Sequence, residues 1–241
     1  MTISPEPSRQ SESVAAGTVT AHPRHRHGFL EILPVAVMLA LYVRTFLFQA
    51  FVVPTPSMEN TVLVGDYVLV NKFVYGPHSS WEERVLPFRS VSRGHVVVFR
   101  SLEDPASDLI KRAVAVPGDV LEIHDRVLRV DGVAQTEPWA HHSDSNVQTD
   151  DRPASDKLRR RDQLPKTHID AGTYFVMGDN RENSSDSRFW GAVPAQNLKG
   201  RALLIYWSLA PPDPAVHANP LPSVADFFRH ARWPRMLRFV R

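Results

Sequence analysis

The longest apolar run of the chain extends over residues 29–53, where only Glu31 and Arg44 carry charge. Its uninterrupted part, residues 32–43, is shorter than the roughly 20 residues that cross a bilayer. If Arg44 snorkels toward an interface and the run continues through Phe51, the length becomes sufficient. We therefore predict one transmembrane helix over residues 29–52, with a buried core helix as the alternative.

The segment before this run sets its orientation. Residues 1–28 are polar and poor in apolar side chains, which predicts disorder. Arg24 and Arg26 lie just ahead of the run, and basic residues in that position keep the adjoining end in the cytoplasm. A cleavable signal peptide is a third option, but no small-x-small site with a polar mature start follows Ala50. The prediction is a single signal anchor, with the chain after about residue 52 outside the cytoplasm.

From Gly65 onward the hydrophobic period changes from helical to two, which indicates strands. Strands are predicted over residues 66–74, 95–99, 109–116, 174–177 and 202–207, with a hairpin of strands 120–124 and 127–130 around Asp125-Arg126. Residues 140–167 are polar with little to bury, which predicts a solvated insertion loop. The predicted fold is a mostly β domain over residues 53–210 with folded-over or barrel-like antiparallel sheets, preceded by one N-terminal transmembrane helix.

The C-terminal part, residues 211–241, divides into two pieces. Residues 211–222 are rich in proline and are predicted to be a spacer. The tail after them carries an arginine at every third position from 229 to 241. At roughly 100° per residue these arginines spread around a helix instead of forming one face, and Pro234 interrupts it. The pattern favours a loosely ordered basic tail, and weak contact with anionic lipid headgroups is compatible with either form.

Composition narrows the function classes. The formal net charge is only +2, so no strong attraction to nucleic acid is implied. The chain has no cysteine, which excludes disulfides, thiolate catalysis and cysteine-ligated metal. No glycine-rich phosphate loop and no internal repeat is present. The candidate chemistry described next needs no metal and no organic cofactor.

The first candidate is the segment Pro54-Thr55-Pro56-Ser57, where the apolar run ends. The two prolines restrict the backbone and present Ser57 at a defined angle. A serine is a poor nucleophile unless a base lies within hydrogen-bond reach and donors await the developing oxyanion. The Gly-x-Ser-x-Gly elbow is missing, and none of the 11 histidines has a context that suggests a triad. The serine is either a nucleophile with another base or a linker residue.

The second candidate is Lys111, which interrupts the apolar strand predicted over residues 109–116. The chain has only five lysines against 23 arginines, so a lysine inside a strand is a less casual choice. Burial lowers the pKa of a lysine, and the neutral amine can then act as a base. From this stretch alone, we favour the alternative that Lys111 is not a base. Its methylene stem would then cover apolar surface while its amine reaches water.

The third candidate is the polar stretch of residues 178–191. A calcium-binding EF-hand loop does not fit, because the glycine and the glutamate that such a loop needs are absent from the sixth and twelfth positions after Asp179. Two interpretations remain open. One is a large structural turn, and the other is a network that supports a neighbouring site, in which we include the residues Asn183, Ser184, Asp186 and Arg188.

Taken together and in this order, these segments resemble the type I bacterial signal peptidases, which are Ser/Lys endopeptidases. The resemblance extends from about residue 31 to 207. It rests on the apolar anchor, the serine segment, Arg93-Gly94-x-Val96-Val97-Val98-Phe99, Lys111-Arg112 with Pro117-Gly118-Asp119, and Gly178-Asp179-Asn180-Arg181 through Ser187-Arg188-x-Trp190-Gly191. Each motif is weak alone, whereas the ordered set after an anchor is specific.

The resemblance implies a role for each matching position. Ser57 would be the acylating nucleophile, Lys111 its general base, and Ser184 the residue that orients the lysine amine. The Ser57 amide and the Thr55 hydroxyl would hold the oxyanion, and Asp186 and Arg188 would form a supporting ion pair. The pockets for the small residues one and three before the scissile bond would be lined by Val53, Pro54, Met58, Val62, Leu109 and Ile110.

The resemblance also implies the setting. Residues 53–210 would be an extracytoplasmic catalytic domain at the cell membrane, whose partners are preprotein signal peptides, the lipid bilayer and the export machinery, with no nucleic acid. Four positions depart from the family pattern: Thr55 replaces a serine, Pro56 removes an amide, Asn60 stands where proline is frequent, and His95 where aspartate is usual. The alternatives are an inactive membrane-anchored β domain that binds envelope partners and a Ser/Lys self-cleaving protease.

Overall fold

The computed structural model describes residues 29–42, 48–72, 91–143, 156–210 and 230–241. The chain divides into two compact units, Met1–Leu39 and Ala40–Arg241. The predictions of a disordered segment over residues 1–28 and of a proline-rich spacer over residues 211–222 fall outside the described residues.

Helix α1 (Phe29–Tyr42) covers the first part of the apolar run. Its apolar side chains from residue 32 onward are exposed, with Met38 at 74% and Val35 at 67%. Among the described residues, no helix has the length and apolar character needed to cross a membrane.

The helix predicted over residues 29–52 is wrong at its C-terminal end, where strand β1 (Phe48–Val52) replaces it. Strand β1 pairs antiparallel with β2 (Asp66–Asn71), from Phe48 opposite Asn71 to Val52 opposite Tyr67. The aromatic and β-branched residues of β1 suit a pleated, half-buried surface. Neighbouring strand β2 supplies the backbone partners, which a sequence pattern alone does not reveal.

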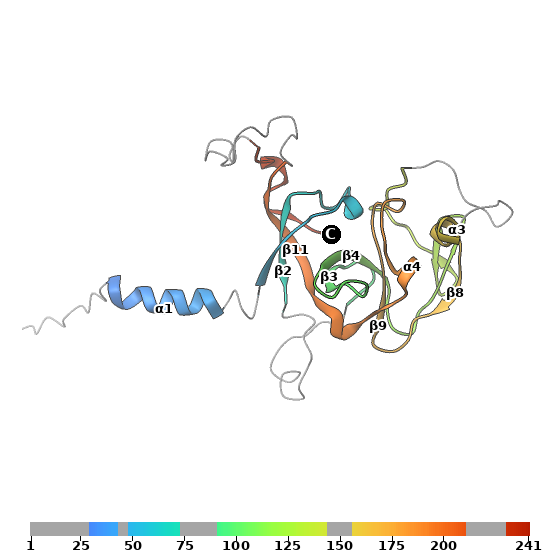
Figure 1. The fold of residues 1–241 in the computed structure, drawn as a ribbon, viewed down its shortest axis with the longest axis horizontal. Helices are drawn as coiled ribbons and strands as arrows, with labels where there is room; N and C mark the ends of the chain where they lie inside the picture. The colour runs from blue at the N-terminus through green and yellow to red at the C-terminus, as the bar shows by residue number, and fades with distance from the viewer. Residues whose placement is uncertain (1–28, 43–47, 73–90, 144–155, 211–229) are drawn as a thin grey trace, which may run out of the picture. The chain divides into compact units, whose positions relative to one another are not determined.

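The main body of the protein is one curled antiparallel sheet (Figure 1). Its strands follow the order β1-β2-β11-β3-β4-β9-β10, and β12 also pairs with β11. The remaining strands of this sheet are β3 (Val96–Arg100), β4 (Asp108–Ala115), β9 (Thr173–Met177), β10 (Val193–Pro194), β11 (Leu198–Ser208) and β12 (Arg238–Phe239). The expected mostly β fold of antiparallel sheets is thereby confirmed.

A second sheet of four strands lies on the side of the domain away from β2 (Figure 1). Its order is β7-β6-β5-β8, and the predicted hairpin is present as β5 and β6. Asp125 and Arg126 both have positive φ, 50° and 67°, as a tight two-residue hairpin turn requires. The strands are β5 (Val120–His124), β6 (Val127–Val130), β7 (Val133–Ala134) and β8 (Leu164–His168).

Two further predictions need correction. The polar excursion of residues 140–167 is not a plain solvated loop, because it contains helix α3 (Asp156–Asp162) and most of β8, and Arg161 and Asp162 are buried. The tail is not loosely ordered in residues 230–241 either. It forms a 3₁₀ turn, η5 (Trp233–Arg235), and strand β12. Asp162 pairs with Arg126 at 3.2 Å, and Arg232 and Arg235 of the tail pair with Asp66, so both segments contact partners far away in the sequence.

Strand β3 joins two parts of the hydrophobic core. Val96 and Val98 belong to one buried cluster, and Val97 and Phe99 belong to another on the opposite face. A strand that is buried on both faces reads as a continuous apolar run, which explains why this short strand is recognisable. A third cluster joins β4, β9 and the small sheet, so the two sheets share a core.

Candidate active site

Ser57 lies in a single 3₁₀ turn, η2 (Pro56–Met58), between β1 and β2. The residue before the turn, Thr55, is extended, and Pro56 fills the first turn position, where an amide has no partner to lose. The turn closes with the Glu59 amide donating to the Pro56 carbonyl at 3.0 Å. The side chain of Ser57 is buried, with 5% of its surface exposed.

Lys111 comes from β4 and reaches Ser57 across the sheet. The distance from Lys111 Nζ to Ser57 Oγ is 2.5 Å, and Lys111 is 3% exposed. The Thr55 hydroxyl lies 3.3 Å from the Ser57 hydroxyl. The structure therefore brings together three of the residues predicted from the sequence, two of which lie 54 positions apart.

Burial has a direct consequence for the amine. Desolvation lowers the pKa of Lys111 from 10.5 to about 8. The charges of Asp186 and Asp179 oppose this shift, and the charge of Arg188 adds to it. Because a buried amine loses more solvation when charged than when neutral, the neutral form is accessible near neutral pH.

Three more predicted residues form a second group on and beside helix α4 (Ser187–Trp190). Asp186 caps this helix, is fully buried, and pairs with Arg188 at 2.8 Å. Burial alone would raise the pKa of Asp186, but the charge and hydrogen bonds of Arg188, with the Gly178 amide and the Ser184 hydroxyl, lower it overall. The aspartate therefore stays ionised beside the buried lysine.

Ser184 differs from the arrangement that the resemblance implied. Within the described part of the chain its hydroxyl donates to Asp186 at 2.8 Å and not to the Lys111 amine. It nevertheless lies close to the nucleophile turn, because both pack against Gly178. A Cβ at Gly178 would overlap the Ser184 side chain and would come within 2.5 Å of the Ser57 carbonyl oxygen. Only glycine fits between them.

The predicted pocket residues are mostly buried. Val53, Met58 and Val62 have no exposed surface, and Ile110 has 2%. These four belong to one hydrophobic cluster. Leu109 is half-buried, packs against a different cluster, and lies apart from this group. Pro54 is exposed.

Sequence reasoning missed the role of Asn180. Its backbone amide donates to the Ser57 carbonyl at 3.1 Å, and its side-chain amide donates to the Pro56 carbonyl at 3.3 Å. The same side-chain nitrogen lies 3.2 Å from a Glu59 carboxylate oxygen. Asn180 thus fixes both ends of the nucleophile turn. Its position next to Asp179 in a polar stretch was the available signal.

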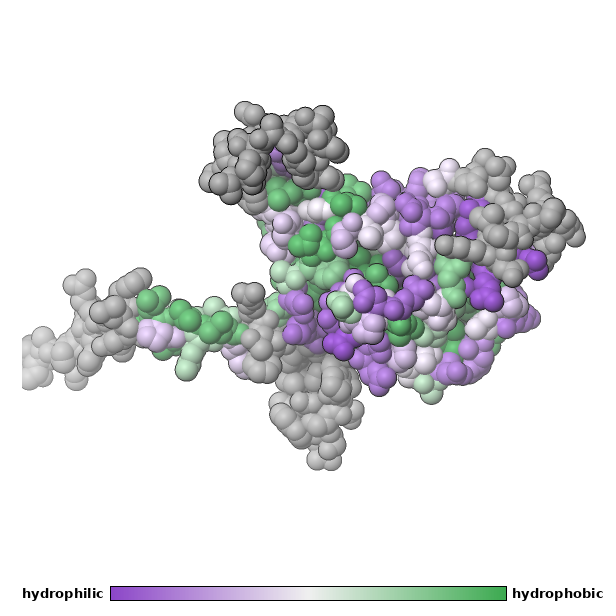
Figure 2. Space-filling view, viewed as in Figure 1, coloured by the Kyte–Doolittle hydropathy of each residue, from purple (hydrophilic) through white to green (hydrophobic). Residues whose placement is uncertain are grey.

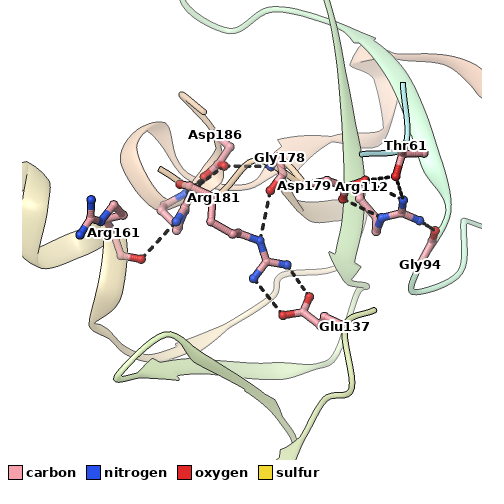
Figure 3. Close-up of polar contacts among 10 residues, drawn as sticks. Thr61, Gly94, Arg112, Glu137, Arg161, Gly178, Asp179, Arg181 and Asp186 are labelled. Atoms are coloured by element: carbon pink, nitrogen blue, oxygen red, sulfur yellow. Dashed lines mark hydrogen bonds and ion pairs between the residues drawn. The ribbon is translucent and has the colours of Figure 1, made fainter. Parts of the chain in front are cut away.

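A second missed feature is the pair formed by Arg112 and Asp179, which are each 1% exposed. The Arg112 guanidinium donates two hydrogen bonds to Asp179, at 2.8 and 2.7 Å (Figure 3). Its Cζ atom lies over the Trp139 ring, 4.4 Å from the ring centroid. Thr61 Oγ1 joins the pair by donating to Asp179 at 2.5 Å. The network connects β4, the loop after η2 and the segment after β9.

The described residues contain no group of three or more His, Cys, Asp or Glu side chains that could hold a metal ion. The arrangement can instead support attack by a hydroxyl. A buried amine lies against a serine oxygen, and a second hydroxyl lies beside it. Serine with lysine as base is a recognised variant of the serine nucleophile and its base.

Known proteins are similar to this chain over most of its length. Residues 26–207 match the signal peptidase family, peptidase S26. Signal peptidase I of Aquifex aeolicus is 31% identical, over 84% of this chain and 93% of that protein. Signal peptidase I of Pseudomonas aeruginosa is 35% identical, over 76% of this chain and 72% of that protein. A crystal structure of a signal peptidase I from Enterococcus faecalis is 28% identical, covers 47% of this chain and 97% of that one, and has a TM-score of 0.36.

Matches of this extent define the protein as a serine endopeptidase. The chain belongs to the signal peptidase family, peptidase S26, and within it to the type I signal peptidases.

Proposed function

We propose that this protein removes signal peptides from exported preproteins by cutting after a small residue. Ser57 is the nucleophile and Lys111 the general base. The observation that carries the proposal is the 2.5 Å contact between Lys111 Nζ and Ser57 Oγ, both buried. The identity to signal peptidases I supports the substrate class.

The reaction follows from these positions. Neutral Lys111 takes the Ser57 proton while Oγ attacks the carbonyl carbon, and the amine then gives the proton to the leaving nitrogen. An acyl-enzyme on Ser57 remains. Lys111, neutral again, takes a proton from a water molecule as its oxygen attacks the ester carbon. The amine then returns this proton to Ser57 Oγ as the C–Oγ bond breaks, which frees the carboxyl product and restores the serine. The Arg188–Asp186 pair supplies a fixed charged environment near the amine.

Substrate selection rests on the buried apolar cluster next to the turn. Val53, Met58 and Val62 are already packed against each other, so little depth remains for a substrate side chain. Small residues fit such a shallow surface, and larger ones would force the core apart.

The membrane setting belongs to the proposal as well. Helix α1 exposes apolar side chains that lipid would cover, with the N-terminal basic residues toward the cytoplasm. In the catalytic unit, hydrophobic atoms gather over β2, β11 and the C-terminal residues (Figure 2). Among the C-terminal residues, Trp233 and Phe239 are exposed, at 55% and 66%. These features support catalysis close to the bilayer, where translocated signal peptides emerge.

The test of the function is cleavage of a preprotein by the purified full-length protein in detergent. Mass spectrometry of the products should place the cut after a small residue, and a serine-directed acylating inhibitor should modify Ser57. Cleavage at other positions, or labelling of another serine, would contradict the assignment.

The rate should depend on pH through Lys111. Because its pKa is lowered to about 8, kcat/KM is expected to rise about tenfold per pH unit below that value and to level off above it. Measurement of kcat/KM on a peptide substrate between pH 6 and pH 10 checks this. A profile that is flat below pH 8, or that keeps rising toward pH 10.5, would remove the general-base role.

Thr55 should matter through its hydroxyl. Thr55→Val keeps the β-branch and shape but removes the donor 3.3 Å from Ser57 Oγ, and kcat is expected to fall about 10²–10³-fold. Thr55→Ser keeps the donor and should retain most of the activity. Steady-state kinetics with one peptide compare the three proteins. Equal losses in both variants would assign Thr55 a packing role instead.

A further inference from the structure

We propose that the C-terminal strap, defined as residues 230–241, holds the Ser57 turn in its reactive position, with Arg235 as a positioning residue. The proposal rests on the function of Ser57 proposed above. It concerns the arginine-rich tail, which the catalytic mechanism leaves without a role.

The strap is bound to the main sheet by its backbone. The Arg232 amide donates to the Ser208 carbonyl at 2.9 Å, and β12 pairs with β11, with Phe239 opposite Leu204. The ring of Trp233 packs edge-on against Trp207, with 5.8 Å between centroids. The strap is therefore a fixed part of the catalytic unit.

Two arginines of the strap converge on one buried carboxylate. Asp66, at the start of β2, has no exposed surface. Arg235 Nη2 donates to its Oδ2 at 2.7 Å, and Arg232 Nη2 donates to its Oδ1 at 3.1 Å. The Ser208 hydroxyl donates to Oδ1 at 2.6 Å. Burial would raise the pKa of Asp66, but Arg235 and the other donors lower it overall, so the site holds a charge.

The same guanidinium also contacts the loop between the nucleophile turn and β2. Arg235 Nη2 donates to the Thr61 carbonyl at 3.2 Å. The other acceptor of Arg235, Asp66, also accepts from the Leu63 amide at 2.8 Å. Arg235 is thus bound to both ends of residues 61–66, while Arg232 binds the Val64 carbonyl between them at 2.7 Å.

This loop leads directly to the reactive serine. The Thr61 amide donates to the Met58 carbonyl at 3.1 Å, so Thr61 closes the turn that carries Ser57. Its hydroxyl donates to Asp179, whose neighbour Asn180 holds the Ser57 carbonyl. A shift of Thr61 would therefore move the turn and its Asn180 contact together.

The strap also supplies a side chain to the core beside the turn. Val240, 6% exposed, belongs to the same buried cluster as Met58, Val53 and Val62. The strap thus supports the turn through charge at one end and through packing at the other. The buried position of Asp66 makes the pairing costly to lose, because an unpaired carboxylate would remain in the interior.

The chain offers a matched pair of variants. Arg235→Gln removes the guanidinium that binds Asp66 and Thr61, whereas Arg238→Gln removes the same charge from an exposed side chain three residues away in the same strap. In Arg235→Gln, kcat is expected to fall about ten- to a hundredfold, with KM within twofold, since small displacements at a reactive group have effects of that size. Arg238→Gln should match the wild type. Arg235→Lys, which keeps the charge, should recover part of kcat.

Hydrogen exchange provides a readout that does not depend on activity. Exchange of the amides of residues 57–66 is followed by mass spectrometry of the full-length protein. These amides should exchange faster in Arg235→Gln than in the wild type, and at the wild-type rate in Arg238→Gln. If both variants lose kcat equally, the tail acts through its overall charge, for example on lipid, and the proposal is wrong. Unchanged exchange and unchanged kcat in Arg235→Gln would also overturn it. If residues 57–66 exchange faster in Arg235→Gln than in the wild type, but the wild type cleaves no preprotein, the proposed function is wrong and the role of the strap in holding the turn is kept.

Discussion

Ser57→Ala is expected to abolish cleavage, lowering kcat/KM by at least about 10⁴-fold, because no other group can form the covalent intermediate. The substitution removes one oxygen atom from a packed turn. The turn itself should persist, since its backbone bonds to Glu59 and Asn180 do not involve the hydroxyl. The variant should melt like the wild type and should still bind a signal peptide.

The measurement is single-turnover cleavage of a preprotein with enzyme in excess. Ser92→Ala serves as the control, because it makes the same change at an exposed serine of the same domain and should be fully active. The acylating inhibitor should label the control and leave Ser57→Ala unmodified. Residual cleavage above about 1% of the wild-type rate would assign the nucleophile to another residue.

Lys111→Met is expected to have the second largest effect, again with a loss in kcat/KM of at least about 10⁴-fold. The methionine fills a similar volume but cannot accept the proton of Ser57 Oγ, which the amine contacts at 2.5 Å. Folding should not suffer. A buried amine whose pKa is depressed by desolvation costs free energy in its charged form, so an apolar replacement is expected to leave the melting temperature equal or higher.

Lys166→Met is the matched control, because Lys166 is an exposed lysine on β8 and its replacement removes the same charge. The pH dependence separates the possible explanations. Any residual activity of Lys111→Met should lose the rising limb near pH 8, whereas Lys166→Met should keep it. A Lys111→Met variant that retains both rate and limb would show that a different group takes the proton.

The order of motifs in the sequence was sufficient to predict the family, the β fold and the pairing of Ser57 with Lys111. The apolar strands β3 and β4 and the hairpin of β5 and β6 were visible because their residues alternate or run together locally. Strand β1 was not, because its five residues continue the composition of the preceding helix. Only the pairing with β2 distinguishes this strand from a continuation of the helix.

The tail shows the same limit more clearly. Its arginines, three residues apart, have no helical face, so local reasoning predicted little order. Asp66, the partner of two of them, lies 166 positions before Arg232 and 169 before Arg235. The buried pair of Arg112 and Asp179 is similarly distant, at 67 positions. From sequence alone, a charged residue is predicted to be solvent-exposed. Its burial can be predicted only when its ion-pair partner is known, and the three-dimensional fold determines that partner.

The long separation in sequence between Asp66 and the arginines of the strap has a consequence for biosynthesis. Strands β1 and β2 leave the ribosome early, but Asp66, the first residue of β2, pairs with Arg232 and Arg235 only after residues 230–241 have emerged. In a nascent chain that lacks these residues, the Asp66 carboxylate has no arginine partner and the Ser57 turn lacks its contacts with the strap. The peptidase is expected to become competent only after residues 230–241 have emerged and bound Asp66, and a chain truncated before residue 230 would be made without that competence.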